Sequence, residues 1–205
     1  EQGITVVHVV SSSKFAVKAQ QAGCDAVVAE GFEAGGHNGR EETTTMVLVP
    51  AVCAAVDIPV LAAGGIATGR QMLAAMVLGA EGVQVGSRFV ASVEASSHAN
   101  FKNRVIHAGE GDTYLSLKQL TPVRLLKNEF FTQVQEAEKK CASEEALKQL
   151  LGKGRAKLGM FEGNREEGEL EIGQVSALIK NIKPAAEIVK EICAEYETAL
   201  KQPVK

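Results

Sequence analysis

His37 is the residue whose type and setting first suggest chemistry in this sequence. It lies in the stretch AEGFEAGGHNGRE, residues 29–41, which follows an apolar run and contains four glycines. An imidazole titrates near neutral pH and can transfer protons there, and the glycines directly before it would let the backbone lie against a ligand. The alternative is a surface histidine without a role. Glu30 and Glu33 are nearby and are either acid–base carboxylates or solvated loop acids.

Two later loops have the small residues of a phosphate site. The loop AAGGIATG contains Gly64 and Gly65, and the loop VGSRF contains Gly86 and Ser87. Each follows an apolar strand, and such loops offer backbone N–H groups and a helix N-terminus to a dianion. One glycine loop is often only a tight turn, but two in consecutive units predict a phosphate-binding site.

A series of strand–helix units must position these loops. The predicted strands cover residues 4–10, 25–30, 58–63 and 82–86, and the predicted helices cover 14–23, 44–56 and 70–80. Strands this apolar need cover on both faces, which parallel βα units provide. A doubly wound sheet and a (β/α)₈ barrel both fit, and the regular unit favours the barrel. We therefore expect an α/β fold that is the C-terminal half of a TIM barrel, strands five to eight, with the N-terminal half missing from this chain.

The pattern divides the chain into three predicted segments. Residues 1–97 hold the βα units with the phosphate loops, residues 98–173 form a charged, mostly helical lid or subdomain after strand eight, and residues 174–205 close the barrel with terminal helices. His8, inside the first strand, is expected in a core or barrel lining. The final helix, from residue 184 to about 200, carries an apolar stripe that should dock on the barrel. Its members are Ala185, Ile188, Val189, Ile192 and Tyr196.

Composition excludes several classes of function. The 205 residues carry a net charge of −3, so neither nucleic acid nor an anionic membrane is indicated as a partner. No apolar stretch approaches the roughly 20 residues that span a bilayer. The four cysteines are far apart, which argues against zinc and disulfides and favours reduced thiols in the cytoplasm. No GxGxxG follows a strand, so a dinucleotide-binding Rossmann fold is not supported.

Four motifs, in order and over nearly the whole chain, resemble the nitronate monooxygenase family. They are AEGFEAGGHNG, IPVLAAGGIATGR, LGAEGVQVGSRFVAS and GQVSALIKNIKPAAEIV. This family of FMN-dependent (β/α)₈ barrels also includes enoyl-acyl-carrier-protein reductase II. The resemblance implies FMN as cofactor, and an N-terminal half of the barrel that carries part of the flavin site.

The resemblance also implies roles for single residues, with His37 as the active-site histidine at the flavin ring. The other implied FMN-binding residues are Glu30, Gly35, Gly64, Gly65, Gln84, Val85, Gly86 and Ser87. Gly64, Gly65, Gly86 and Ser87 are implied at the phosphate. Glu30 stands where some relatives carry Gln, and Ser87 stands where many carry Thr.

We expect the reaction to be NAD(P)H-dependent reduction of a trans-2-enoyl-acyl-carrier-protein in fatty acid elongation, with His37 supplying or orienting the proton at the α-carbon. The tail at residues 167–192 favours this branch. The alternative within the family is oxidation of alkyl nitronates with O₂, and the substrate would then be a small molecule. A barrel that binds a phosphorylated metabolite without redox chemistry stays open, as does a homodimer.

Overall fold

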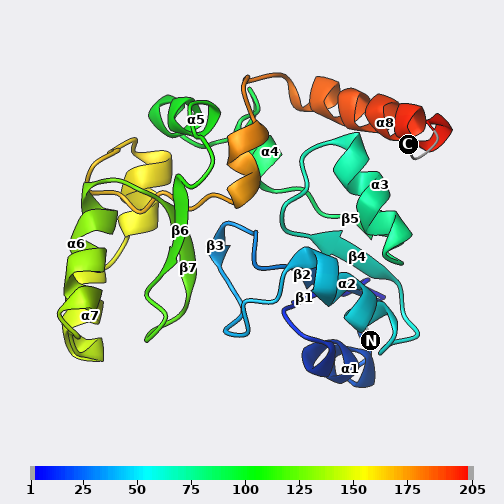
Figure 1. Cartoon of the computed structure of the whole chain (residues 1–205), viewed down its shortest axis with the longest axis horizontal. Coiled ribbons are helices and arrows are strands. Elements are labelled where there is room, and N and C mark those ends of the chain that lie inside the picture. Colours follow the sequence, from blue (N-terminus) through cyan, green and yellow to red (C-terminus); the bar gives the residue numbers. More distant parts are fainter. Residues whose placement is uncertain (1–2, 203–205) are drawn as a thin grey trace. The chain divides into compact units, whose positions relative to one another are not determined.

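The computed structural model describes residues 3–202, and Figure 1 shows the order of the elements along the chain. By its internal contacts the chain divides into two compact units. Unit 1 consists of Glu1–Glu33, Glu41–Val85 and Val189–Lys205, and unit 2 consists of Ala34–Arg40 and Gly86–Ile188. The outermost residues of the first and last predicted segments, 1–2 and 203–205, lie outside the described part.

Unit 1 is built on a parallel sheet. Its strands are β1 (Val7–Val10), β2 (Ala26–Glu30), β4 (Val60–Ala63) and β5 (Gly82–Val83), in the order β1-β2-β4-β5. The predicted α/β fold with a parallel sheet is thus confirmed. The spatial order follows the chain order without a reversal, as in a barrel, whereas a doubly wound sheet reverses its strand order. The assignment to barrel strands five to eight stays a prediction.

Three helices follow the strands of this sheet: α1 (Ser13–Gln21), α2 (Thr45–Cys53) and α3 (Gly69–Val77). The start of α3 is fixed by a capping box, in which the Thr68 side chain accepts from the Gln71 amide and the Gln71 side chain accepts from the Thr68 amide. The core beneath the helices is aliphatic. Its most buried members include Val27, Ala29, Val49, Val52 and Ala62, all at 0% exposure.

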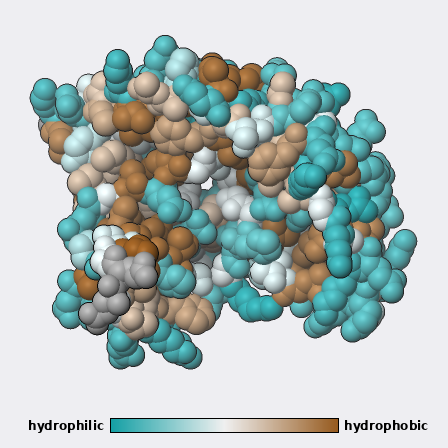
Figure 2. All heavy atoms as spheres, turned by 180° about the vertical axis from the view of Figure 1, so that it is seen from behind, coloured by the Kyte–Doolittle hydropathy of each residue, from teal (hydrophilic) through white to brown (hydrophobic). Residues whose placement is uncertain are grey.

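The β1 edge of the sheet differs from the prediction. His8, expected in a core or barrel lining, is exposed, and β1 is an edge strand with β2 as its one neighbour in the described sheet. Apolar side chains gather on the face of unit 1 near β1 (Figure 2), and Ile4, Val7 and Val9 are among the exposed large hydrophobic residues.

Unit 2 contains an antiparallel sheet that the sequence did not predict. Its strands are β3 (Gly36–His37), β6 (Thr113–Ser116) and β7 (Val123–Leu126), in the order β3-β7-β6. The segment 98–173, expected to be mostly helical, therefore holds β6 and β7 in addition to its helices. Strands of four residues show too few periods to stand out, and a buried Arg124 interrupts the apolar pattern of β7.

The remaining elements of unit 2 are helical. They are α4 (Ser87–Val90), α5 (Ala99–Ile106), α6 (Glu129–Lys139), α7 (Glu144–Leu151), a π-helical turn at Lys157–Phe161 and a 3₁₀ helix at Gln174–Leu178. Phe130 and Val134 of α6 and Leu147 of α7 pack with Leu125 of β7 in one buried cluster. This cluster holds the hairpin β6–β7 against the two helices.

The last helix, α8 (Ala185–Lys201), lies where it was predicted. Ile188 and Ile192 of its apolar stripe are buried, but Val189 is 49% exposed, so the buried stripe is narrower than expected. In unit 1, a side chain at Gly69 would place its Cβ 2.2 Å from the Tyr196 amide, so α8 meets the first turn of α3 at backbone distance. None of the helices in residues 3–202 is long and apolar enough to cross a membrane.

A Gly35→Ala substitution should test the packing of unit 2. The new Cβ would lie 2.4 Å from the carbonyl carbon of Ile172 and 2.5 Å from the Gly173 amide nitrogen. Because backbone atoms must move to relieve this overlap, the free energy of unfolding should fall by about 1–3 kcal/mol in urea denaturation. In the matched control Gly109→Ala, the nearest atom to the new Cβ is 3.8 Å away, and stability should hardly change. Equal stability of the two variants would contradict this packing.

Candidate active site

In unit 1, the predicted site begins where β2 and β4 end. Glu30 is the last residue of β2 and pairs in register with Ala63, the last residue of β4. Burial raises the pKa of the Glu30 carboxyl, which is partly enclosed at this edge of the sheet. The carboxyl ends of parallel strands are where ligands bind in α/β proteins, so the predicted placement of Glu30 at a strand end is confirmed.

The loops after these two strands are fastened to each other by Thr45. Its hydroxyl oxygen lies 2.9 Å from Glu33 Oε2 and 2.9 Å from the carbonyl oxygen of Gly64. The Thr45 amide also donates to the Glu33 carboxylate at 2.9 Å. Glu33, left open as an acid–base or a solvated group, therefore serves as an acceptor that joins the loop after β2 to the start of α2.

Gly64 and Gly65 are required by the shape of the loop after β4. Both have positive φ, at +88° and +72°, which favours glycine. A Cβ at Gly64 would lie 2.7 Å from the carbonyl oxygen of Gly31, so the backbone of the loop after β2 occupies the space beside Gly64. Within the described residues, the amides of Gly65 and Ile66 donate to no protein acceptor. Gly65 is partly exposed, so its amide is available to an anion, whereas Ile66 is buried.

The segment after β5 is the second predicted phosphate loop. The predicted strand 82–86 ends early, at Val83, although the Gln84 amide still donates to the Ala62 carbonyl at 2.8 Å. The Gln84 side chain is exposed, and Val85 packs against the core of unit 1.

Gly86 and Ser87 continue this loop in unit 2. A Cβ at Gly86 would meet no atom within 4 Å, so open space lies beside the backbone. In the part of the chain that the structure covers, the amides of Gly86 and Ser87 have no protein acceptor. The Ser87 hydroxyl accepts a hydrogen bond from the Gly173 amide at 3.0 Å.

Close packing within unit 2 explains why glycines precede His37. Gly35 lies against the backbone of Ile172 and Gly173, and Gly36, with φ +74°, would place a Cβ 2.5 Å from Glu171 Oε2. The close backbone approach predicted for this loop thus exists, and in the structure its partner is the segment 171–173. Contact of the same loop with a flavin stays a prediction.

The strand β7 places Glu171 next to this loop. Gly36 pairs with Arg124 and His37 with Val123, while Leu125 pairs with Glu171. Leu125 also pairs with Tyr114 of β6, so Glu171 occupies the opposite edge of β7, the edge that β3 occupies. Glu171 and Gly36 are therefore neighbours along one edge, although they are far apart in sequence.

His37 lines a cavity of about 300 Å³ together with two glutamates, Glu169 and Glu171. Apolar residues form much of the remaining wall, among them Leu117, Val123 and Leu151. Glu169 is only 8% exposed. Among the residues that the structure covers, neither carboxylate has a hydrogen-bond or ion-pair partner. Unpaired carboxylates that are largely buried are unusual and mark candidate functional groups, and here they lie beside the exposed His37.

Burial raises the pKa of both acids. It raises the pKa of Glu169 to about 7, with the neighbouring Glu171 adding to the effect and Arg155 opposing it. Burial also raises the pKa of Glu171, opposed by His37. Arg155 is held elsewhere, since it donates to the carbonyl oxygen and Oε2 of Glu167 at 2.8 and 3.1 Å. Glu169 thus changes charge close to neutral pH.

The sequence interpretation missed these two acids. In the stretch GELEIG, acidic and apolar residues alternate, and a period of two puts Glu169 and Glu171 on one face of an extended segment. That alternation was the available signal. It could not reveal that the segment pairs with β7, because β7 was itself not predicted.

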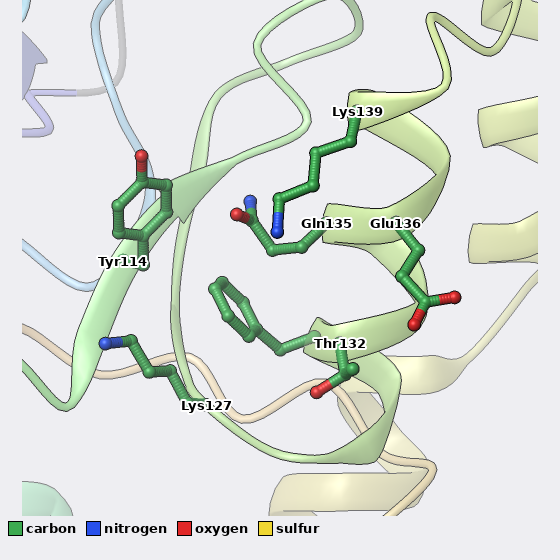
Figure 3. Close-up of a pocket in the computed structure, with 7 residues that line it drawn as sticks. Tyr114, Lys127, Thr132, Gln135, Glu136 and Lys139 are labelled. Atoms are coloured by element: carbon green, nitrogen blue, oxygen red, sulfur yellow. The ribbon is translucent and has the colours of Figure 1, made fainter.

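A second hollow of unit 2, of about 440 Å³, lies between β6 and α6 (Figure 3). Lys139 and Gln135 extend from α6 toward Tyr114, whereas Glu136 points away from it. Tyr114 and Phe131 meet edge to face, with 5.8 Å between their ring centroids. No residue of the predicted site lines this hollow, and we do not assign the active site to it.

The predicted site residues divide between the two units. Those in unit 1 are Glu30, Gly64, Gly65, Gln84 and Val85, and those in unit 2 are Gly35, His37, Gly86 and Ser87. Unit 2 brings Gly35 and Ser87 to the same residue, Gly173. No group of three or more His, Cys, Asp or Glu side chains within residues 3–202 could hold a metal ion, and the four cysteines are free thiols.

Comparison with known proteins gives the family. The nitronate monooxygenase family matches residues 1–195. A probable nitronate monooxygenase of Staphylococcus saprophyticus is 35% identical over 193 residues, which cover 89% of this chain and 54% of that protein. A putative monooxygenase of Mycobacterium tuberculosis is 46% identical over 127 residues, 60% of this chain and 33% of that protein.

Solved structures agree with this relationship. FabK from Thermotoga maritima superposes with a TM-score of 0.91 and 42% identity, covering 97% of this chain and 63% of its own. A nitroalkane oxidase from Streptomyces ansochromogenes superposes with a TM-score of 0.78 and 29% identity, over 97% of this chain and 59% of its own. The chain spans about half the length of the first curated relative and less than two thirds of FabK. It belongs to the nitronate monooxygenase family.

Proposed function

We propose that this chain carries the phosphate loops and the active-site histidine of an FMN-dependent oxidoreductase. The observation that carries the proposal is the likeness to FabK, which covers 97% of the chain at 42% identity. In the same proposal, the parallel sheet of unit 1 is barrel strands five to eight, and the remaining strands belong to the part of the relatives that this chain does not span.

The residues present fit the cofactor that the family implies. The amides of Gly65, Gly86 and Ser87 have no acceptor in the described chain, and open space lies beside Gly86. The family resemblance assigns Gly64 and Gly65 of unit 1, and Gly86 and Ser87 of unit 2, to the phosphate, and backbone N–H groups of this kind bind dianions well. The residues proposed to lie along the rest of the cofactor are Glu30, Gly35, Gln84 and Val85. FMN, when bound, supplies the redox chemistry.

The first candidate reaction is NAD(P)H-dependent reduction of a trans-2-enoyl thioester, with an acyl-carrier-protein substrate. FabK is an enoyl-acyl-carrier-protein reductase II, and the likeness of this chain to it supports the reaction. Reduction adds a hydride at the β-carbon and a proton at the α-carbon, so the site must supply an acid. His37 would hold this proton, because an imidazolium donates readily near neutral pH.

The second candidate reaction is the oxidation of alkyl nitronates with O₂. It is supported by the family itself and by the curated relatives, several of which are probable nitronate monooxygenases. The likeness to a nitroalkane oxidase at 29% identity points in the same direction. His37 would then deprotonate or orient the substrate.

A His37→Ala variant should separate cofactor binding from chemistry. The purified full-length protein should be yellow, with flavin absorbance bands in the visible blue, and the variant should keep that colour. Its turnover should fall by roughly 10²-fold or more, which is the usual effect of losing an acid–base group. His107→Ala is the matched control, since His107 is an exposed histidine of unit 2 outside the cavity, and it should leave the rate unchanged. A colourless full-length protein would refute the flavin proposal, and unchanged turnover in His37→Ala would remove His37 from the mechanism.

Two assays on the same preparation should distinguish the reactions. We expect NAD(P)H oxidation that depends on a crotonyl thioester, followed at the nicotinamide absorbance, to be faster than O₂ uptake with propyl nitronate. O₂ uptake with the nitronate and no thioester-dependent NAD(P)H oxidation would establish the second candidate instead.

A further inference from the structure

We propose that Glu169 and Glu171 share one proton beside His37 and return it to the imidazole ring after each turnover. The proposal rests on the proposed function, in which His37 gives a proton to the substrate. Glu169 and Glu171 would act as positioning and proton-supplying residues without touching the substrate.

The backbone brings the three groups to one place. Glu171 pairs with Leu125 on the edge of β7 that β3 occupies, and its carboxylate lies directly over Gly36, the residue before His37. Glu169 is two residues away in an extended segment, so its side chain leaves the same face. All three side chains line the 300 Å³ cavity. The cavity is therefore a shared space for one imidazole and two carboxyl groups.

The charges around the cavity favour a shared proton. Arg155 is engaged by Glu167, Arg124 donates to the Thr113 hydroxyl at 3.5 Å, and Glu138 accepts from the Leu117 amide. Lys118 and Lys153, on the two loops beside the cavity, are exposed. Arg155 partly offsets the rise in the pKa of Glu169, and the other groups that face each other are His37, Glu169 and Glu171. Two ionised carboxylates with this much burial would repel each other, so the pair keeps one proton until the pH rises above neutral.

The proposed proton transfers balance. The imidazolium of His37 loses its N–H proton to the α-carbon, while the hydride at the β-carbon comes ultimately from NAD(P)H. Since the ring and the Glu171 carboxyl, both within the described residues, are not hydrogen-bonded to each other, water in the cavity carries the carboxyl proton to the neutral ring. The pair, now doubly negative, then recovers a proton from solvent. Water can reach the pair because Thr121, Gly152 and Gly154 on the cavity wall are exposed.

A Glu171→Gln substitution should change the titration of Glu169 whether or not the protein is active. With glutamate carboxyls labelled with ¹³C, NMR should show Glu169 titrating near pH 7 in the unaltered protein. In Glu171→Gln the midpoint should move to lower pH, because the like charge is gone while burial remains. Glu110→Gln, an exposed acid of unit 2, is the control and should leave it unchanged. An unmoved midpoint in Glu171→Gln would mean that the two acids do not share a proton, and would overturn the proposal.

The same variant should slow only the step that needs the proton. Reduction of the bound flavin by NAD(P)H and its first reoxidation by the enoyl thioester should be unchanged, because the first reoxidation uses the proton already on His37. Steady-state turnover, which needs the proton returned to His37, should slow by roughly tenfold at pH 8. The alkaline limb of the kcat profile should move to lower pH, with KM unaltered.

Glu169→Gln provides a second variant should Glu171→Gln fold poorly, and it should slow the same step. If Glu171→Gln shifts the Glu169 midpoint but leaves steady-state turnover unchanged, the pair is structural and the proton supply is refuted. An inactive or colourless protein with the shifted midpoint would count against the proposed function alone.

The stability of Glu169→Gln offers a test that needs no cofactor. Since the folded protein raises the pKa of Glu169 from 4.5 to about 7, it binds this proton more tightly than the unfolded chain does. The unaltered protein should therefore lose stability as the pH rises from about 4.5 through 7. Glu169→Gln, which stays neutral, should gain in unfolding free energy relative to it between pH 5 and pH 8 in urea denaturation. A parallel pH dependence of the two proteins would show that Glu169 is ionised throughout and would overturn the shared proton.

Discussion

The packing of two glycines against a distant piece of backbone is the constraint on which unit 2 depends. Gly35 and Gly36 lie so close to residues 171–173 that neither could carry a side chain without displacing backbone or a carboxylate. This contact sets the position of His37, because His37 is the next residue and pairs with β7. It also brings Glu171, and through it Glu169, into the cavity that the histidine lines. The acid–base chemistry proposed for this chain is therefore a result of backbone packing.

In unit 1, a side chain holds the loops of the predicted site in position. Thr45 holds the loop after β2 and the loop after β4 at hydrogen-bond distance from a single hydroxyl. Because Gly64 is also in contact with Gly31, these two loops are held by both backbone and side chain. The amides that remain without a protein acceptor are thereby kept in a fixed arrangement, which is what binding of a dianion requires.

The sequence predicted well where the structural signal is local. The parallel strands and their helices in residues 4–80 follow from apolar runs and glycine ends, and α8 follows from its periodicity. The prediction failed where the position of a segment depends on pairing with residues far away in the sequence. The strands β6 and β7 are short, and β7 buries Arg124, so no local pattern in the sequence predicted these two strands. Without β7, the sequence could not place Glu171 beside Gly36. His8 was misjudged because the burial of a strand depends on its neighbours, and β1 has one.

The double pairing of Leu125 has a consequence for how this family can vary. Leu125 joins β6 on one side and Glu171 on the other, so the hairpin is the partner that keeps the tail of the chain next to the loop of His37. A relative that lost the β6–β7 hairpin would lose the support for its histidine, even if every residue of the histidine loop were retained. In this chain the glycine–histidine loop, the hairpin and the GELEIG segment form one structural unit, so a deletion in one of them in a relative should be compared with the other two.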